Sequence, residues 1–371
     1  MSQTCLYNKY RPNKLSEVVG QDHIKKYFTN ATGKDKISHA YLFCGGKGLG
    51  KTSMARIVSL IVNCENGPKV DYDLNDKNVK SIIEGSCPDV HELDAASSTS
   101  IDHIREIRSL AKNFPIMCRK RVFIIDEVAR LNAPAASALL KVLEEPPESA
   151  MFILCTTEPH KILPTILSRC QRLNFYSIPH KEISAYLLEI CKKEGIKNVE
   201  DDSLALISKA ARGSMRDALS ILEPVITQSD GSIKKEDIQS LIGNSLGQGI
   251  FCDLLGYFCT GDYRKAIATV RKVVSTGADL EKIFLEFLEH SYDMMLAKSV
   301  STTGFVYLED ATVEKWKKIV KETDIEILAY VCKKFMNYVD MLNTTRRIDI
   351  ALDTCIIEII NDIKNGKYKT T

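Results

Sequence analysis

Short apolar runs alternate with helix-like patterns between His39 and Phe175. The runs are HAYLFC, DVHELD, RVFIID, MFILCT and RLNFY, and the stretches between them repeat apolar residues at a spacing near 3.6. Parallel strands need long crossover connections, which helices usually supply. The pattern therefore predicts an α/β fold class over residues 1–177, with a parallel sheet covered by helices.

Downstream of this region only helical patterns remain. Residues 178–243 contain a helical stretch at 203–211 and an apolar stripe made of Met215, Leu219, Leu222 and Ile226. A polar, glycine-bearing link, GNSLGQG, then leads into a second helical region that runs to about Lys364. We therefore expect a small helical domain at 178–243 and a third, all-helical domain at 244–371.

Composition limits what these domains do. The 371 residues are 44% apolar, which is enough for several packed cores, and 50 basic residues nearly balance 48 acidic ones. A net charge of +2 gives no general basic surface, so any contact with nucleic acid has to be local. The twelve cysteines form no CxxC pair, and no signal peptide or membrane-spanning run is visible, so we expect reduced thiols in the cytoplasm.

A phosphate-binding loop directly follows the first apolar run. The segment Gly45, Gly46, Lys47, Gly48, Leu49, Gly50, Lys51, Thr52 fits GxxxxGK[ST] and opens a helix that begins near Ser53. Backbone N–H groups of such a loop surround a triphosphate, and the lysine ammonium reaches its outer phosphates. The motif predicts ATP as the bound nucleotide, with the Thr52 hydroxyl as a ligand of Mg²⁺.

An acidic pair ends the third apolar run, RVFIID. Asp126 is placed to complete the Mg²⁺ shell, and the next residue, Glu127, is placed to orient or deprotonate an attacking water. An acidic pair after a strand is common in loops, so its meaning depends on the glycine loop. The two motifs together predict an ATPase.

Longer segments narrow the class of ATPase. LLKVLEEPPESAMFILCTTEPHKILPTILSRCQRLNF, RGSMRDALSIL, YNKYRP and EGSCPDVHELDAASSTSIDHIREI resemble the gamma/tau subunits of the bacterial DNA polymerase III clamp loader, an AAA+ family. The resemblance covers Tyr7 to Gly243. It implies an AAA+ sheet domain, a helical lid and a helical collar that assembles the subunits.

The resemblance also implies roles for individual residues. Arg169, in SRC, would reach in trans into the ATP site of a neighbouring subunit, and Arg216, in GSMRDAL, would sense the nucleotide from the lid. Arg216 lies about 100° from the apolar stripe of its helix, so it is free to face a ligand. Thr156 or Thr157 would orient the lytic water, with Thr157 favoured, and Arg11 and Val19 of the N-terminal arm would contact the base.

Family members act as part of an assembly. The resemblance implies a homotrimer of this subunit within a pentamer, together with other clamp-loader subunits, a sliding clamp and primer-template DNA held through its phosphates. Candidate phosphate contacts are Ser98, Thr99 and Ser100, which precede a helix, and the basic cluster Arg119 to Arg121. That cluster is also typical of an ordinary solvated loop.

Two segments depart from the family pattern. Many relatives carry four zinc-binding cysteines after the phosphate-loop helix, where this chain has Cys64, Asp73, Asp76 and Val79. Valine cannot bind zinc and two aspartates with one thiolate suit it poorly, so no zinc is expected, although Cys87 could supply a further ligand. Ala129 and Arg130 replace a histidine and a methionine that are usual after the acidic pair.

Two other functions remain open on the sequence. Another AAA+ DNA motor, of the branch-migration type, would share the phosphate loop and the acidic pair, although LLKVLEEPP and SRC argue against it. A structural loader subunit that does not hydrolyse ATP is the second alternative. The presence of Lys51, Thr52, Asp126, Glu127 and Arg216 argues against that one.

Overall fold

The computed structural model of the protein describes residues 5–97, 101–200, 203–242, 248–275, 280–300, 318–319, 321–342 and 347–369. The chain divides into two compact units, Met1–Leu241 and Ile242–Thr371, and each is described by itself. The domain boundary predicted at 243/244 lies two residues beyond this division. Most of the predicted link at 243–249 falls outside the described residues.

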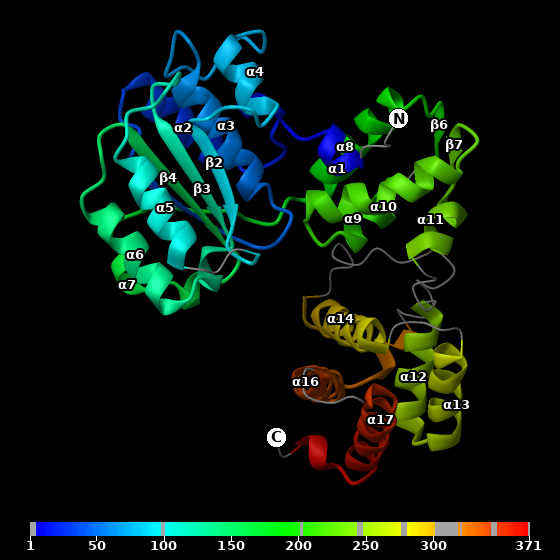
Figure 1. Cartoon of the computed structure of the whole chain (residues 1–371). Coiled ribbons are helices and arrows are strands. Elements are labelled where there is room, and N and C mark those ends of the chain that lie inside the picture. Colours follow the sequence, from blue (N-terminus) through cyan, green and yellow to red (C-terminus); the bar gives the residue numbers. More distant parts are fainter. Residues whose placement is uncertain are drawn as a thin grey trace. The chain divides into compact units, whose positions relative to one another are not determined.

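The first unit contains the predicted parallel sheet, so the fold-class prediction is confirmed (Figure 1). Its strand order is β2-β3-β4-β1-β5, and every neighbouring pair is parallel. The five strands match the five predicted runs, with these bounds: β1 Ala40–Cys44, β2 Val90–Asp94, β3 Arg121–Asp126, β4 Ala150–Thr156 and β5 Gln171–Asn174. The carboxyl ends of β2, β3, β4 and β1 therefore meet along one edge of the sheet.

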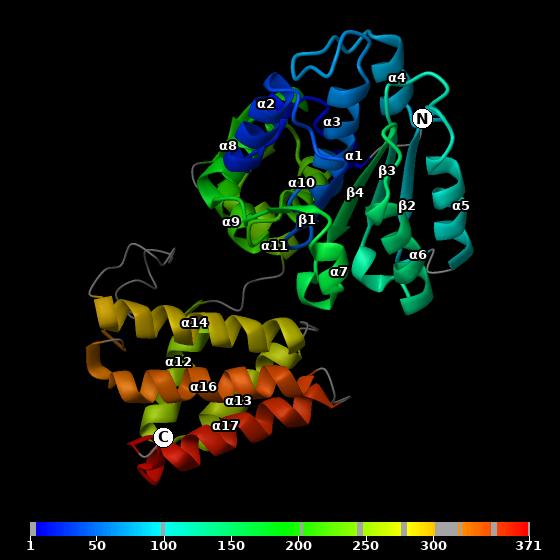
Figure 2. The ribbon, with the colours of Figure 1, turned by 90° about the vertical axis from the view of Figure 1, so that its left-hand side faces the viewer.

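Helices cover both faces of the sheet, as Figures 1 and 2 show. The helices that cover it are α2 Asp22–Gly33, α3 Lys51–Asn63, α4 Lys77–Ile83, α5 Ile101–Ala111, α6 Ala133–Glu144 and α7 Pro164–Leu167, whereas α1 Leu6–Lys9 packs on the helical subdomain that follows the sheet. One apolar core joins α2, α3 and α4 to alternate strand residues such as Tyr41 and Ile124. The other core joins α5, α6 and α7 to the intervening residues, such as Leu42 and Phe123. Because successive strand residues face opposite sides, burial on both faces requires the continuous apolar runs that the sequence shows.

A small helical subdomain follows β5 in the same unit. It consists of α8 His180–Lys193, α9 Ser203–Ala210, α10 Met215–Gln228 and α11 Lys235–Ile242. Leu187 and Ile190 of α8, Ile207 of α9, and Leu222 and Val225 of α10 are all buried. Leu222 belongs to the stripe predicted from the sequence, so the helical spacing there was interpreted correctly.

The prediction that this subdomain is purely helical is wrong in one detail. Asn198–Val199 (β6) and Ser232–Ile233 (β7) form a short parallel pair. The Lys197 N–H also donates to the Gly231 carbonyl over 2.9 Å, which extends the contact between the two loops. Two-residue strands are too short to show any alternation in sequence, and such pairing depends on the packing of the helices around it.

The second unit is entirely helical within its described residues. Its helices are α12 Gln248–Thr260, α13 Tyr263–Val274, α14 Leu280–Val300, α16 Ile325–Leu342 and α17 Ile348–Lys364. Figure 2 shows α14 and α16 side by side, and one apolar core that includes Phe284, Phe335 and Ile356 joins the helices. This unit therefore has a core of its own.

Candidate functional site

A cavity of about 690 Å³ opens at the carboxyl edge of the sheet, within the range typical of small-ligand sites. The N-terminal arm, the glycine loop, the ends of β2 and β3, and the lid helix α10 all line it. It brings together most of the predicted site residues: Arg11, Val19, Lys47, Gly48, Leu49, Gly50, Lys51, Thr52, Ser53, Asp126, Glu127, Thr157 and Arg216. Of the other predicted residues, Gly45, Gly46 and Arg169 do not line it.

The glycine loop turns tightly between β1 and α3. Gly48 and Gly50 have φ values of 73° and 90°, a region that only glycine adopts freely. The Lys51 ammonium donates to the carbonyl oxygens of Gly45 and Gly46, over 2.8 and 2.7 Å. Burial lowers the pKa of Lys51, which marks a partly desolvated cation at the start of the helix. A loop of this kind suits an anionic ligand at the α3 N-terminus.

Thr52 and Asp126 meet at the position expected for a metal ion. The Thr52 hydroxyl donates to Asp126 Oδ2 over 2.6 Å, and the Glu127 N–H donates to Asp126 Oδ1 over 3.0 Å. Hydroxyl and carboxylate oxygens are the ligand type that Mg²⁺ prefers, and Mg²⁺ usually takes its remaining ligands from water and phosphate. The two side chains therefore fit a Mg²⁺–nucleotide complex.

Glu127 is held by the neighbouring strand. Its backbone is left-handed, with φ 49°, and Thr157, which follows β4, donates its hydroxyl to Glu127 Oε2 over 3.0 Å. Thr156 is fully buried, and its hydroxyl oxygen accepts the Glu158 N–H instead. Of the two threonines considered from the sequence, Thr157 is thus the one that contacts the acidic pair.

The lid helix contacts the glycine loop directly. The Met215 N–H at the start of α10 donates to the Gly48 carbonyl over 3.1 Å. Ser214 caps the same helix by accepting the Asp217 N–H over 3.2 Å. A Cβ atom added at Gly48 would lie 1.9 Å from Ser214 Oγ, so the two segments approach as closely as glycine permits. The start of the lid helix and the phosphate loop are therefore in direct contact.

Several lining residues were not predicted as site residues, among them Asp94, Arg130 and Tyr7. Asp94 ends β2 and pairs in register with Asp126, so its place on the same edge could have been inferred from the DVHELD run. Arg130 lies just after the acidic pair, where the sequence showed only a departure from the family. Tyr7 reaches the cavity from the N-terminal arm through tertiary contacts that no local pattern shows.

Arg169 lies after α7, on the surface. Its guanidinium pairs with Glu144 at the end of α6 over 2.8 Å and also donates to the Thr165 carbonyl. Both charged side chains are partly exposed. The residue is therefore accessible to a neighbouring molecule.

The region of the predicted missing zinc site is held by protein contacts. Asp76 caps α4 by accepting the N–H groups of Asn78 and Val79, and it also accepts the Glu65 N–H over 2.6 Å. Val79 is fully buried in the core beside α3. Asp76 thus links the loop after α3 to the start of α4, which is a structural role for this side chain.

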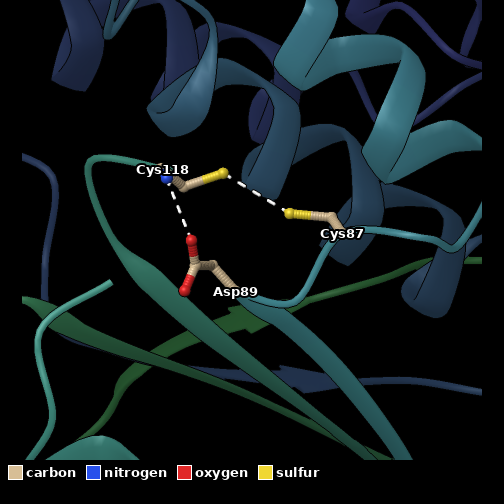
Figure 3. A group of neighbouring side chains, drawn as sticks. All are labelled: Cys87, Asp89 and Cys118. Carbon is tan, nitrogen blue, oxygen red and sulfur yellow. Dashed lines mark hydrogen bonds between the residues drawn. The ribbon is translucent and has the colours of Figure 1, made fainter. Parts of the chain in front are cut away.

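Cys87, Asp89 and Cys118 form the metal-type cluster found among the described residues (Figure 3). The two Sγ atoms lie 3.5 Å apart. Asp89, however, already accepts the N–H groups of Ile116, Met117 and Cys118, and its Oδ1 lies 3.0 Å from the Arg121 guanidinium. The carboxylate oxygens of Asp89 are thus already used by N–H donors and by the Arg121 guanidinium. Only the thiols of Cys87 and Cys118 remain as ligands, which is too few for a structural zinc site.

The candidate DNA contacts have different outcomes. Ser98, Thr99 and Ser100 lie outside the described residues. Arg121 cannot contact DNA as the basic cluster suggested, because it is 4% exposed and its guanidinium binds Asp89 and the carbonyls of Leu110 and Phe114. Arg119 is exposed, and Lys120 is partly exposed, with its ammonium donating to the Glu148 carbonyl. None of the helices in the described ranges combines the length and apolar character needed to cross a bilayer.

Comparisons with known proteins agree with this architecture. Residues 20–179 match the family model "DNA polymerase III, delta subunit", and residues 182–231 match "DNA polymerase III clamp loader subunit, ATPase lid domain". The Thermotoga maritima RuvB Holliday junction branch migration motor has a TM-score of 0.46 at 21% identity, over 67% of this chain and 78% of that chain. A likeness of that size says nothing about shared function.

Two curated relatives are closer in sequence. The DNA polymerase III subunit tau of Bacillus subtilis is 43% identical over 81% of this chain and 53% of its own length, and this chain spans about half of several such relatives. The DNA polymerase III subunit gamma of Buchnera aphidicola is 34% identical over 87% of this chain and 88% of its own. The chain therefore belongs to the gamma/tau family of DNA polymerase III clamp-loader subunits.

Proposed function

We propose that this chain is an ATP-hydrolysing subunit of a sliding-clamp loader, which opens the clamp and loads it onto primed DNA during replication. The observation that carries the proposal is the pair of hydrogen bonds at one edge of the cavity, from Thr52 to Asp126 and from Thr157 to Glu127. Thr52 and Asp126 are the proposed metal ligands, and they lie beside the Glu127 carboxylate, which Thr157 holds in one orientation. A protein that only bound nucleotide would not need the second of these contacts.

The phosphate loop is the proposed binding site for the triphosphate of ATP. The backbone N–H groups from Gly48 to Thr52 and the positive end of the α3 dipole favour a polyphosphate, and the Lys51 ammonium exchanges its two loop carbonyls for phosphate oxygens. Mg²⁺, when bound through Thr52 and Asp126, supplies charge that offsets the negative charge on the transferred phosphoryl group. The hydrogen bond between those two side chains keeps both oxygens in place before binding.

Glu127 is the proposed base that activates or orients the attacking water. Its carboxylate would accept the proton of the attacking water or fix the direction of its lone pair, a contribution of about 10² to 10⁴ in rate. Thr157 occupies Oε2 by hydrogen bonding, which leaves Oε1 for the water. Thr157 therefore acts through Glu127, as a positioning residue.

Arg169 would complete the site of a neighbouring subunit. It does not line the cavity of its own chain and it lies partly exposed beside Glu144. An arginine supplied in this way is worth about 10³ to 10⁵ in turnover. A single chain should thus hydrolyse ATP slowly until a partner supplies the cation.

The proposed partners follow from the family. Three copies of this chain would assemble with the companion loader subunits into a pentamer, and the second unit would form the collar between them. Primer-template DNA would be held through its phosphates, which fits a chain whose net charge is only +2.

Hydrolysis is tested with Glu127→Gln in the full chain, assembled with its clamp, companion subunits and primed DNA. The amide is the same size, so ATP binding should stay within about two-fold while turnover falls by about 10² or more. Glu326→Gln, on helix α16 of the second unit, is the matched control and should behave as wild type. Wild-type turnover in Glu127→Gln, or turnover that clamp and primed DNA fail to stimulate, would refute the proposal.

A further inference from the structure

An aromatic ring lies against the sensing arginine of the lid. The Arg216 guanidinium carbon is 4.9 Å from the centroid of the Tyr7 ring, which is within the range of a cation–π contact. Both residues line the nucleotide cavity. Tyr7 is half-buried and Arg216 is exposed, so the ring is the more fixed of the two partners.

The ring is fixed because α1 is attached to the lid. The Leu6 N–H donates to Glu223 of α10 over 3.3 Å, and Lys9 pairs with Glu194, just after α8, over 2.7 Å. Tyr10 donates its hydroxyl to the same glutamate, and the Tyr186 hydroxyl donates to the Tyr10 carbonyl over 3.3 Å. Tyr7 therefore moves with the lid that carries Arg216.

The arm then crosses to the sheet domain. Tyr72 donates its hydroxyl to the Asn13 carbonyl, and Lys25 donates to the Val18 carbonyl over 3.1 Å. The segment between Tyr10, which is held by the lid, and Asn13, which is held by Tyr72, includes Arg11, a residue that lines the cavity. One short segment thus links the lid to the sheet domain at the nucleotide.

The charges explain why an aromatic partner suits this position. Within the described part of the chain, no carboxylate lies within ion-pair distance of Arg216. Arg11 lines the same cavity as Arg216. The pKa of Arg11 is lowered, first by burial and then by the positive charges of Arg56 and Arg216, while Glu92 acts in the opposite direction. A carboxylate partner would neutralise Arg216 and would have to be displaced by phosphate, whereas a ring holds the group and leaves its charge in place.

We propose that Tyr7 is a positioning residue that holds the Arg216 guanidinium over the nucleotide cavity with its charge available to the terminal phosphates of ATP. This rests on the role proposed for Arg216. A direct stacking contact between Tyr7 and the base is the competing explanation, because Tyr7 lines the same cavity as Arg11 and Val19.

The two explanations differ in their dependence on the γ-phosphate. We would measure the affinity of the full chain for ADP and for a non-hydrolysable ATP analogue in Tyr7→Phe, Tyr7→Leu, Arg216→Ala and the Tyr7→Leu/Arg216→Ala double variant. Tyr7→Phe keeps the ring and should stay within about two-fold of wild type. Tyr7→Leu should weaken the ATP analogue by about three- to five-fold, as a cation–π contact of roughly 1 kcal/mol implies, and leave ADP unchanged.

The double variant isolates the coupling. Once Arg216 is alanine, Tyr7→Leu should have no further effect, while Tyr292→Leu, an exposed tyrosine of α14, serves as the control in both backgrounds. Equal losses for ADP and the ATP analogue would favour base stacking and overturn the proposal, as would an undiminished Tyr7→Leu effect in the double variant. If Arg216→Ala alone leaves ATP affinity intact, the role of Arg216 falls and this proposal with it, whereas hydrolysis is judged separately by Glu127→Gln.

Discussion

A buried carboxylate organises the end of the sheet opposite the candidate nucleotide cavity. Asp89 precedes β2 and is 0% exposed, and its partner Arg121 begins β3. Burial raises the pKa of Asp89, but the N–H groups of Met117, Ile116 and Cys118, together with the Arg121 guanidinium, outweigh it and hold the pKa below its usual range. The ion pair therefore links the start of β2 to the loop that leads into β3.

Replacing Asp89 by asparagine should destabilise the chain strongly. The change leaves the Arg121 guanidinium buried without a counter-ion and turns an NH₂ group toward N–H donors, at a cost of about 3–5 kcal/mol. Urea unfolding would measure it, with Asp102→Asn, an exposed ion-pair partner of Arg105, as the control below about 1 kcal/mol. Equal unfolding midpoints for the two variants would contradict this assignment.

The same pair gives a pH dependence with a definite sign. The folded pKa of Asp89 is depressed, so its stabilisation is fully present above the unfolded value of about 3.9 and is lost as the pH falls toward the folded value. The difference in stability between wild type and Asp89→Asn should therefore shrink on acidification below about pH 4. Unfolding curves recorded between neutral and acid pH would test that direction.

At the scale of elements, the glycine loop and the start of α10 are in direct contact, so a change in the loop is expected to reach the lid. Gly48 has a positive φ, and a methyl group there would overlap Ser214 Oγ and approach Arg216 Cβ at 3.1 Å. Gly48→Ala should weaken ATP binding by about ten-fold or more, since it strains the loop and displaces the start of α10. Calorimetric titration with ATP would show the loss.

The matched control is Gly33→Ala, at the end of α2. No atom lies within 4 Å of the added Cβ, and the φ of Gly33 is not positive, so nucleotide affinity should not change. Wild-type affinity in Gly48→Ala would mean that the lid does not rest on the loop in solution.

Elements with local signals were predicted well from the sequence. The five strands are buried on two faces and read as apolar runs, and the glycine loop and the acidic pair were found because each is contiguous in sequence. The β6–β7 pair was missed because each strand has two residues. Tyr7 was missed as a site residue because its place beside Arg216 depends on α1 packing against the lid, and no spacing in the chain encodes that contact.

At the scale of the whole molecule, the second unit leaves apolar side chains exposed. Met336 of α16 and Ile350 of α17 are 55% and 51% exposed, and Ile357, seven residues after Ile350, lies on the same face of α17. Met336→Glu with Ile350→Glu should shift the assembled chain toward monomer in analytical ultracentrifugation, because both charges would enter an apolar interface. Phe114→Glu, at a residue of the first unit that is 86% exposed, is the control, and a shift of equal size there would point to non-specific association.

The assignment of Arg169 predicts that two inactive variants restore each other. Arg169→Ala keeps an intact acidic pair but offers no cation to its neighbour, and Glu127→Gln offers the cation but cannot activate water. Each alone should lose about 10² or more in turnover. The exposed ion pair with Glu144 is worth at most about 1 kcal/mol, so it does not prevent Arg169 from crossing to the next subunit.

The two variants are mixed at equal concentration and allowed to exchange subunits. At an interface between two copies, ATP is hydrolysed only if the copy that holds the nucleotide is Arg169→Ala and the copy that donates the arginine is Glu127→Gln. Roughly a quarter of these interfaces meet that condition, so the mixture should recover roughly a quarter of the wild-type rate. The recovered rate should fall when one variant is in large excess, because fewer interfaces then combine the two. A mixture no faster than its separate components would mean that Arg169 serves its own chain or none. Arg169 is not among the residues that line the cavity of its own chain, so recovery in the mixture is the result expected if two copies complete one site.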